Sequence, residues 1–178
     1  VPMGKWIFET VCQHVNILLD KGLRLKIAVN VSGIQFLQDG FVKEVTSILE
    51  RFQVDPKYIE LEITEGVVIQ DVQKAIEKMH ELRKLGFSLS LDDFGTGYSS
   101  LSYLQQFPIQ KLKIDRAFIK DMDTSNQSYN MAKGIIELAK SLHLVTVAEG
   151  VENKAQWDLL RGLGCDIIQG FYISQAVP

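Results

Sequence analysis

The sequence has few cysteines, few prolines and no long apolar run. Its 178 residues include two cysteines and four prolines. The isolated pair Cys12 and Cys165 forms no disulfide framework, which favours a reducing compartment. No apolar run reaches the roughly 18–20 residues that a membrane-spanning helix needs, and no signal-peptide pattern is present. We therefore expect a cytoplasmic domain without membrane insertion of its own, whether or not a longer parent protein is attached to a membrane.

The chain also has little net charge. The formal net charge is -3, so we expect no basic surface for a nucleic-acid polymer or for anionic lipid. The hydrophobic share of 46% and the aromatic share of 9% are typical of a folded globular protein. Because no linker or low-complexity segment interrupts the chain, we interpret residues 1–178 as a single domain.

Short β-rich runs alternate with amphipathic runs of helical period. The β-rich runs span residues 25–31, 58–64, 87–91, 111–114, 144–148 and 166–173, and the helical runs begin near Trp6 and span 41–52, 72–85, 98–107, 128–142 and 153–163. This alternation predicts right-handed βαβ units and a parallel sheet. Gly86 and Gly164 are placed as helix C-caps, and Asn153 is placed as an N-cap.

The polar residues favour a closed barrel over an open, doubly wound sheet. Six of them fall at or near the carboxyl ends of different strands: Asn30, Glu62, Asp92, Lys113, Glu149 and Gln169. In a barrel these ends meet on one rim, where the catalytic residues of that fold lie, whereas an open sheet would spread them along a line. We therefore predict an α/β fold, a modified (β/α)8 TIM-like barrel with about six of its eight strands in this chain.

The rim is rich in carboxylates, from Glu62, Asp92, Asp93 and Glu149. Carboxylates a few ångströms apart raise one another's pKa unless a cation neutralises them. A divalent metal is the simplest such cation, and hard oxygen ligands favour Mg²⁺ or Mn²⁺ over Zn²⁺. A single acid at a strand end is more often a helix cap or a solvated side chain. Polar groups on six strand ends are less ordinary, so we predict a metal site.

The adjacent pair Asp92-Asp93 is the sharpest local feature. Neighbouring residues of a regular strand point to opposite faces, so both carboxylates reach one site only if the strand ends or bulges there. The following residues 94–97 supply such a break. One carboxylate of the pair can then bridge two cations, and two metals roughly 3.5–4 Å apart suit in-line phosphoryl transfer. Lys113 can stabilise charge on the transferring phosphate or steady the attacking water.

At these residues the chain resembles the EAL-domain family, bacterial phosphodiesterases of the second messenger cyclic di-GMP. The matching segments follow the family's order and cover nearly the whole chain. They are Val29-Asn30-Val31-Ser32, Leu61-Glu62-Ile63-Thr64-Glu65, Asp92-Asp93-Phe94-Gly95-Thr96-Gly97-Tyr98-Ser99-Ser100-Leu101, Leu112-Lys113-Ile114-Asp115-Arg116, Val147-Ala148-Glu149-Gly150-Val151-Glu152, and Cys165-Asp166 with Gln169-Gly170. The resemblance implies a modified (β/α)8 barrel that hydrolyses cyclic di-GMP to the linear dinucleotide by a two-metal, in-line mechanism.

The resemblance also implies a ligand set for two Mg²⁺ or Mn²⁺ ions. By the family pattern, Asn30, Glu62 and Asp92 bind one metal. Asp92, Asp93 and Glu149 hold the other. One further metal-binding glutamate of the family belongs to its Glu-Ala-Leu motif, which this chain lacks.

The remaining site residues take their roles from the same resemblance. Glu149 is the family's usual group for activating water, Lys113 assists the nucleophile, and Gln169 supports the water network. Glu65 and residues 93–100 resemble a loop that orders the metal site in relatives and often forms part of a dimer contact. From its position alone, Glu65 is equally consistent with a plain loop acid.

The missing motif leads to two expectations about this chain. A barrel without its first two strands has unpaired edges and an uncovered interior, so we expect a homodimer, a strand-exchanged oligomer or partial disorder. Loss of one metal ligand predicts low or no turnover. The resemblance further suggests regulatory domains elsewhere in a parent chain.

Two alternative functions stay open at this point. A non-catalytic EAL module would keep the fold and bind cyclic di-GMP without cleaving it. Retention of Glu62, Asp92 and Glu149 favours the enzyme over that module, and the missing glutamate weighs against it. An unrelated barrel that uses Mg²⁺ on another phosphate or enolate substrate is the weaker alternative.

Overall fold

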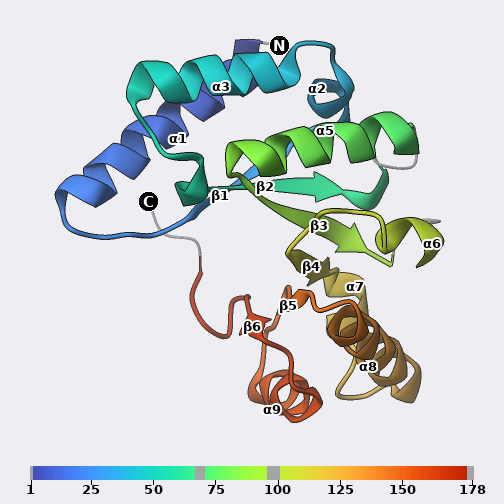
Figure 1. Cartoon of the computed structure of the whole chain (residues 1–178). Helices are drawn as coiled ribbons and strands as arrows, with labels where there is room; N and C mark the ends of the chain where they lie inside the picture. Colours follow the sequence, from blue (N-terminus) through green and yellow to red (C-terminus); the bar gives the residue numbers. More distant parts are fainter. Residues whose placement is uncertain (1, 67–70, 96–100, 176–178) are drawn as a thin grey trace. The chain divides into compact units, whose positions relative to one another are not determined.

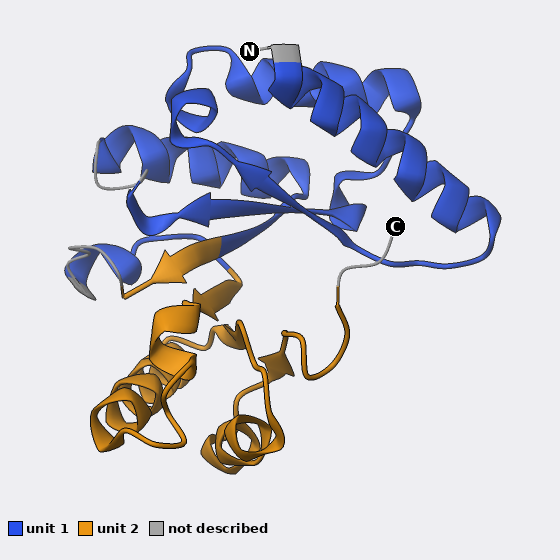
Figure 2. Ribbon diagram, turned by 180° about the vertical axis from the view of Figure 1, so that it is seen from behind, with its two compact units in different colours: residues 1–90, 100–109 blue, residues 91–99, 110–178 orange. Residues whose placement is uncertain are grey.

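The structure is a computed structural model that describes residues 2–66, 71–95 and 101–175 (Figure 1). Its strands form a six-stranded sheet in the order β1-β2-β3-β4-β5-β6, which is also their order along the chain. The chain divides into two compact units (Figure 2). Unit 1 comprises residues 1–90 and 100–109, and unit 2 comprises residues 91–99 and 110–178. Strand β3 therefore begins in unit 1 and ends in unit 2.

Unit 1 contains the first strands and their helices. Its elements are α1 (Pro2–Asp20), β1 (Ile27–Val31), α2 (Gly33–Leu37), α3 (Phe41–Phe52), the short 3-10 helix η1 (Pro56–Tyr58), β2 (Ile59–Thr64), α5 (Val72–Leu85), the start of β3 (Ser88–Phe94) and α6 (Leu101–Leu104). Strands β1 and β2 pair in parallel, with Ile27 opposite Ile59 and Val31 opposite Ile63. Every residue of β2 except Thr64 is buried, as expected for a parallel strand that is covered on both faces.

The core of unit 1 joins its helices to one face of these strands. Helices α1 and α3 lie side by side (Figures 1 and 2), and the rings of Phe8 and Phe41 meet edge to face with centroids 6.2 Å apart. Val29 and Val31 of β1 are buried, whereas Ala28, on the opposite face of the strand, is exposed. One face of β1 is thus packed against the unit and the other is open.

Unit 2 contains the rest of the sheet. Its elements are the end of β3, β4 (Lys111–Ile114), α7 (Arg116–Ile119), α8 (Asn126–Ser141), β5 (Val145–Ala148), α9 (Lys154–Leu163) and β6 (Ile167–Ile168). β4 pairs with β5, and β5 with β6, in parallel. The buried side chains of α8, which include Ile136 and Ala139, face the core of the unit.

Most of the predicted elements are present, and most of their ends lie within two residues of the prediction. Exceptions include β3, which ends three residues later than expected, at Phe94, and α1, which begins at Pro2 rather than near Trp6. The predicted caps are correct: Gly86 and Gly164 end α5 and α9 in the left-handed conformation, and Asn153 forms a capping box with Gln156 at the start of α9. The predicted strand 166–173 is wrong over most of its length, because only residues 167–168 are extended in the sheet. Residues 96–100, where the helix 98–107 was expected to begin, lie outside the described residues, and α6 covers Leu101–Leu104.

None of the helices in the described ranges is both long enough and apolar enough to cross a membrane.

Candidate active site

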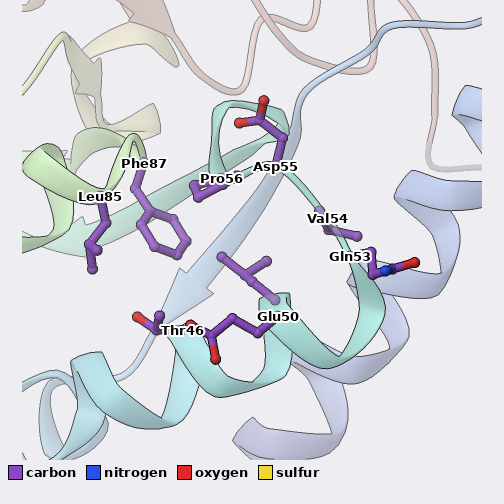
Figure 3. A pocket seen from close by; sticks show the side chains of 9 residues that line it. Thr46, Glu50, Gln53, Val54, Asp55, Pro56, Leu85 and Phe87 are labelled. Atoms are coloured by element: carbon purple, nitrogen blue, oxygen red, sulfur yellow. The ribbon is translucent and has the colours of Figure 1, made fainter.

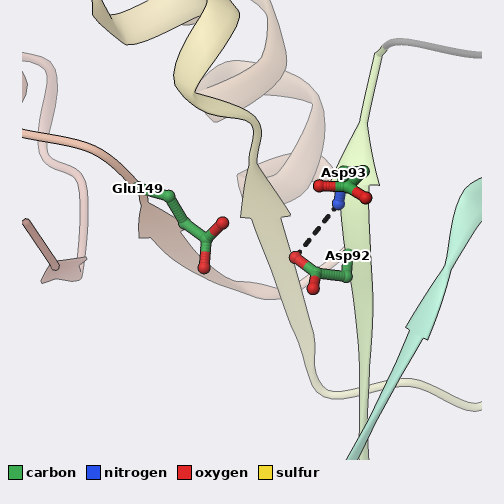
Figure 4. Close-up of side chains that lie close together, drawn as sticks. All are labelled: Asp92, Asp93 and Glu149. Atoms are coloured by element: carbon green, nitrogen blue, oxygen red, sulfur yellow. Dashed lines mark hydrogen bonds between the residues drawn. The ribbon is translucent and has the colours of Figure 1, made fainter. Parts of the chain in front are cut away.

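The two adjacent aspartates lie at the carboxyl end of β3, in unit 2. The backbone of Asp93 is left-handed, with φ of +55°, and its amide donates a hydrogen bond of 3.0 Å to Oδ1 of Asp92. This torsion interrupts the regular alternation of the strand, so that both carboxylates point to one site (Figure 4). The predicted interruption is therefore present: it begins at Asp93 itself and continues at Gly95, whose φ is +96°.

Glu149 brings a third carboxylate to this pair. It follows β5, and its amide donates a 3.2 Å hydrogen bond to the carbonyl of Ile114, the last residue of β4. One oxygen from each of Asp92, Asp93 and Glu149 lies within 4.8 Å of the others. Figure 4 shows these three side chains close together. Side chains that are far apart in sequence thus meet because they follow the carboxyl ends of different strands.

Lys113 neutralises part of this negative charge. It comes from β4, and its Nζ lies 3.0 Å from Oδ1 of Asp92 and 2.8 Å from Oε1 of Glu149. Only 7% of its side chain is exposed. A lysine ammonium is almost never buried without a partner, and here two carboxylates compensate its desolvation.

The charge of Asp93 remains costly despite this lysine. Burial, followed by the nearby carboxylates of Asp92, Asp115 and Glu149, raises the pKa of Asp93 above its ordinary value of 3.8. Asp115 also accepts an amide hydrogen bond of 2.8 Å from Ala117 and thereby caps α7. A divalent cation would offset this repulsion between like charges. The donor set, which consists of hard carboxylate oxygens, fits Mg²⁺ or Mn²⁺.

A pocket of about 230 Å³ opens beside Glu149. Its walls come from the turns that follow β4, β5 and β6. The lining residues are Arg116, Glu149, Gly150, Glu152, Gln169, Gly170 and Phe171. Of the site residues predicted from the sequence, the pocket therefore brings Gln169 and Glu149 together. It is also lined by Arg116 and Phe171, to which the sequence assigned no role.

The remaining predicted site residues belong to unit 1. Asn30 and Glu62 are register partners in the parallel pair of β1 and β2, so their side chains lie on the same face of adjacent strands. Glu62 is buried, and Asn30 is exposed beside a pocket of about 390 Å³ that Thr64 also lines. Glu65, directly after β2, is only 2% exposed, so it is not a solvated loop acid.

Another pocket of unit 1 does not resemble a catalytic site. It measures about 360 Å³ and lies between the end of α3 and the turn that joins α5 to β3 (Figure 3). Its walls include Leu49, Val54 and Phe87, and the carboxylate of Asp55 is already paired with Lys57 at 2.6 Å. Catalytic residues of barrel enzymes lie at the opposite, carboxyl ends of the strands.

Comparison with known proteins agrees with this geometry. The EAL domain model matches residues 1–176. The chain is 40% identical over its full length to the signaling protein YkoW of Bacillus subtilis, of which it covers 22%. It is 38% identical to the bifunctional diguanylate cyclase/cyclic di-GMP phosphodiesterase MucR of Pseudomonas aeruginosa, of which it covers 26%. The chain thus spans about a quarter of the length of these relatives.

Solved structures give the same family. The phosphodiesterase of MucR in complex with cyclic di-GMP superimposes with a TM-score of 0.96 at 38% identity, over 100% of this chain and 72% of that chain. The EAL domain of Mycobacterium smegmatis DcpA superimposes with a TM-score of 0.90 at 36% identity, over 97% of this chain and 78% of that chain. EAL domains are TIM-barrel-like, which agrees with the predicted fold. The chain therefore belongs to the EAL domain family.

Proposed function

We propose that this EAL domain hydrolyses one phosphodiester bond of cyclic di-GMP. Water attacks one phosphorus, one P–O bond of the ring breaks, and a linear dinucleotide with a terminal phosphate and a terminal hydroxyl leaves. The meeting of Asp92, Asp93 and Glu149 around the ammonium of Lys113 carries this proposal. Support also comes from the relatives, since MucR is named a cyclic di-GMP phosphodiesterase and its structure is a cyclic di-GMP complex.

The carboxylate cluster would hold the metal that EAL domains require. Asp92, Asp93 and Glu149 are the ligands that we assign to it, with Mg²⁺ or Mn²⁺ as the ion. Such an ion would polarise a phosphoryl oxygen and lower the pKa of a nearby water. Asn30 and Glu62 stay predicted ligands of the second metal. Because they lie opposite each other on β1 and β2, their side chains are on the same face, which is consistent with binding of one metal ion by both.

The side chains of the site divide the remaining chemistry. The Glu149 carboxylate accepts the proton of the attacking water, and Lys113 stabilises the negative charge that develops on the phosphoryl oxygens. Gln169 lines the same pocket as Glu149 and holds the water there. Glu65, which is buried directly after β2, stays a predicted supporting residue.

The test is a cleavage assay on the natural protein that carries this chain. Cyclic di-GMP is incubated with Mg²⁺, with Mn²⁺ or with a chelator, and the linear dinucleotide is separated by chromatography. We expect metal-dependent cleavage that falls about 10²- to 10⁴-fold in Glu149→Gln. Asp158→Asn, which changes an exposed acid of α9, is the matched control and keeps full activity.

The outcomes separate the candidate functions. Metal-dependent cleavage supports the enzyme. Binding of cyclic di-GMP without cleavage would instead establish a non-catalytic module, and the absence of both would refute the assignment of substrate.

A further inference from the structure

Arg116 is the positively charged residue in the pocket beside Glu149. Among the described residues that line this pocket, the other charged side chains, Glu149 and Glu152, are acidic. Arg116 begins α7, directly after the turn that follows β4. A cation at the mouth of an otherwise acidic site would attract an anionic ligand.

The neighbouring glycine makes room for this arginine. Gly150 has φ of +69°, and a Cβ at this position would lie only 2.4 Å from Cγ of Arg116 and 2.8 Å from its Cβ and Cδ. Real Cβ atoms essentially never approach other atoms so closely. The stem of Arg116 therefore crosses the turn immediately after Glu149 because residue 150 has no side chain.

The ion pair between Arg116 and Glu152 is exposed, so another anion can compete with Glu152 for the guanidinium. Its Nη2 lies 2.5 Å from Oε1 of Glu152, and the two side chains are 56% and 40% exposed. An ion pair so exposed contributes little to stability. A guanidinium carries five N–H donors in a fork that matches two phosphate oxygens, so a phosphate can share this group or replace Glu152.

We propose that Arg116 binds the second, uncleaved phosphate of a cyclic dinucleotide and thereby favours substrates with two phosphates. This inference rests on the proposed function. Lys113 is buried between Asp92 and Glu149, and we assign it to the phosphate that is cleaved. A ring with two phosphodiesters carries a second anion, and Arg116 is the cationic side chain among the described residues that line the pocket beside Glu149.

The test compares a substrate with two phosphates to one with a single phosphate. The protein that carries this chain is assayed with cyclic di-GMP and with bis(p-nitrophenyl) phosphate, which is followed as a substrate or, if uncleaved, as a competitor. In Arg116→Ala we expect KM for cyclic di-GMP to rise about 10- to 100-fold, as for loss of a charge-assisted hydrogen bond. We expect kcat for cyclic di-GMP to stay within about twofold of the wild type. We expect the same of the KM of bis(p-nitrophenyl) phosphate or, if this probe is not cleaved, of its inhibition constant.

Three further variants guard against a structural explanation. Arg116→Gln keeps the stem beside Gly150 and shows the same rise in KM. Arg116→Lys keeps the charge without the fork and recovers part of the loss. Arg161→Ala, at an exposed position of α9 in the same unit, leaves the kinetic constants for both probes unchanged.

The results distinguish this inference from the proposed function. If the wild-type protein does not cleave cyclic di-GMP, the proposed function fails. If the wild-type protein cleaves cyclic di-GMP but Arg116→Ala changes the constants of both probes equally, or of neither, the proposed role of Arg116 is refuted. The proposed function then still stands.

Discussion

At the scale of single residues, Lys113 is a buried cation that pairs with two carboxylates of the cluster. Its ammonium lies between Asp92 and Glu149 at 3.0 and 2.8 Å and is shielded from water. Removal of one partner from a buried ion pair leaves an uncompensated charge, which costs about 3–5 kcal/mol. The metal-free protein therefore depends on this lysine for its stability.

We expect Lys113→Met to lower the free energy of unfolding of the metal-free protein by about 3 kcal/mol or more. Addition of Mg²⁺ should restore part of that stability, because the cation takes over the compensation of the carboxylates. Urea unfolding with a chelator and with Mg²⁺ measures both effects.

Lys154→Met is the matched control for this lysine. Lys154 also pairs with a carboxylate, that of Asp158, but their side chains are 72% and 56% exposed, so its loss should leave the free energy of unfolding almost unchanged. If both variants lost the same free energy of unfolding, the burial of Lys113 between two carboxylates would not be the source of its contribution to stability.

The sequence identified the acids and the lysine of this cluster but not its surroundings. Strand-end position was sufficient to select Asp92, Glu149 and Lys113, because the ends of parallel strands converge. The contribution of Asp115 to the raised pKa of Asp93 was missed, since it depends on how the turn after β4 folds back. The left-handed torsion of Asp93 has no signature in the residue type other than the tolerance of aspartate for that conformation.

At the scale of elements, the junction between β5 and β6 is held by side chains as well as by the sheet. Asp166 Oδ2 accepts hydrogen bonds from the amide and the hydroxyl of Thr146, at 2.8 and 2.7 Å. The Thr146 hydroxyl in turn accepts a 3.0 Å bond from the amide of Asp166. β6 contains only two residues, so these bonds define where it begins.

The same hydrogen bonds make the contribution of this junction to stability depend on pH. The amide and hydroxyl of Thr146 hold the pKa of Asp166 below its ordinary value of 3.8. A lowered pKa in the folded state stabilises the protein above the unfolded-state pKa, and this stabilisation is lost as the pH falls through the folded-state value.

We therefore expect Asp166→Asn to lower Tm at pH 7 and to differ less and less from the wild type as the pH falls below about 4. Thr146→Val removes the hydroxyl donor but keeps the backbone donor, so its pH-dependent loss should be smaller and of the same sign. Thermal unfolding between pH 3 and pH 7 measures both. A difference between Asp166→Asn and the wild type that is constant with pH would contradict this account.

Helices were easier to predict than the last strand. The helical period and the caps are local, and α5 and α9 end at the predicted glycines. The run 166–173 is rich in β-forming isoleucine and aromatic residues, but Gly170 has φ of +158° and a Cβ there would lie 2.2 Å from the carbonyl oxygen of Val151. The chain therefore turns away from the sheet at a contact that the sequence pattern does not reveal.

At the scale of the whole molecule, open edges and exposed apolar side chains predict self-association. β1 and β6 are the end strands of the sheet in the order that the structure describes, and open edges are sites for pairing with other chains. In unit 1, Met3, Trp6 and Ile34 are 70%, 64% and 76% exposed. We expect a second copy of the chain to cover these apolar side chains.

We expect the isolated 178-residue chain to have a mass above 20.1 kDa in size-exclusion chromatography with light scattering, and to dissociate on dilution. Trp6→Lys and Ile34→Lys should shift the equilibrium toward the monomer, whereas Lys21→Glu, at the exposed residue directly after α1, should not. A single monomeric species at every concentration would refute this expectation. That residues 1–178 form one domain also stays a prediction at this scale.

One further consequence concerns Phe171, on the wall of the pocket beside Glu149. Val151 binds the main chain on both sides of it, through the carbonyl of Gln169 at 3.1 Å and the amide of Tyr172 at 2.9 Å, and the ring of Tyr172 rests against Trp157. Phe171 itself is 65% exposed. Its neighbours thus fix the path of the backbone while most of its own ring is exposed, so a substitution at residue 171 can reshape the wall of this pocket without disturbing the fold.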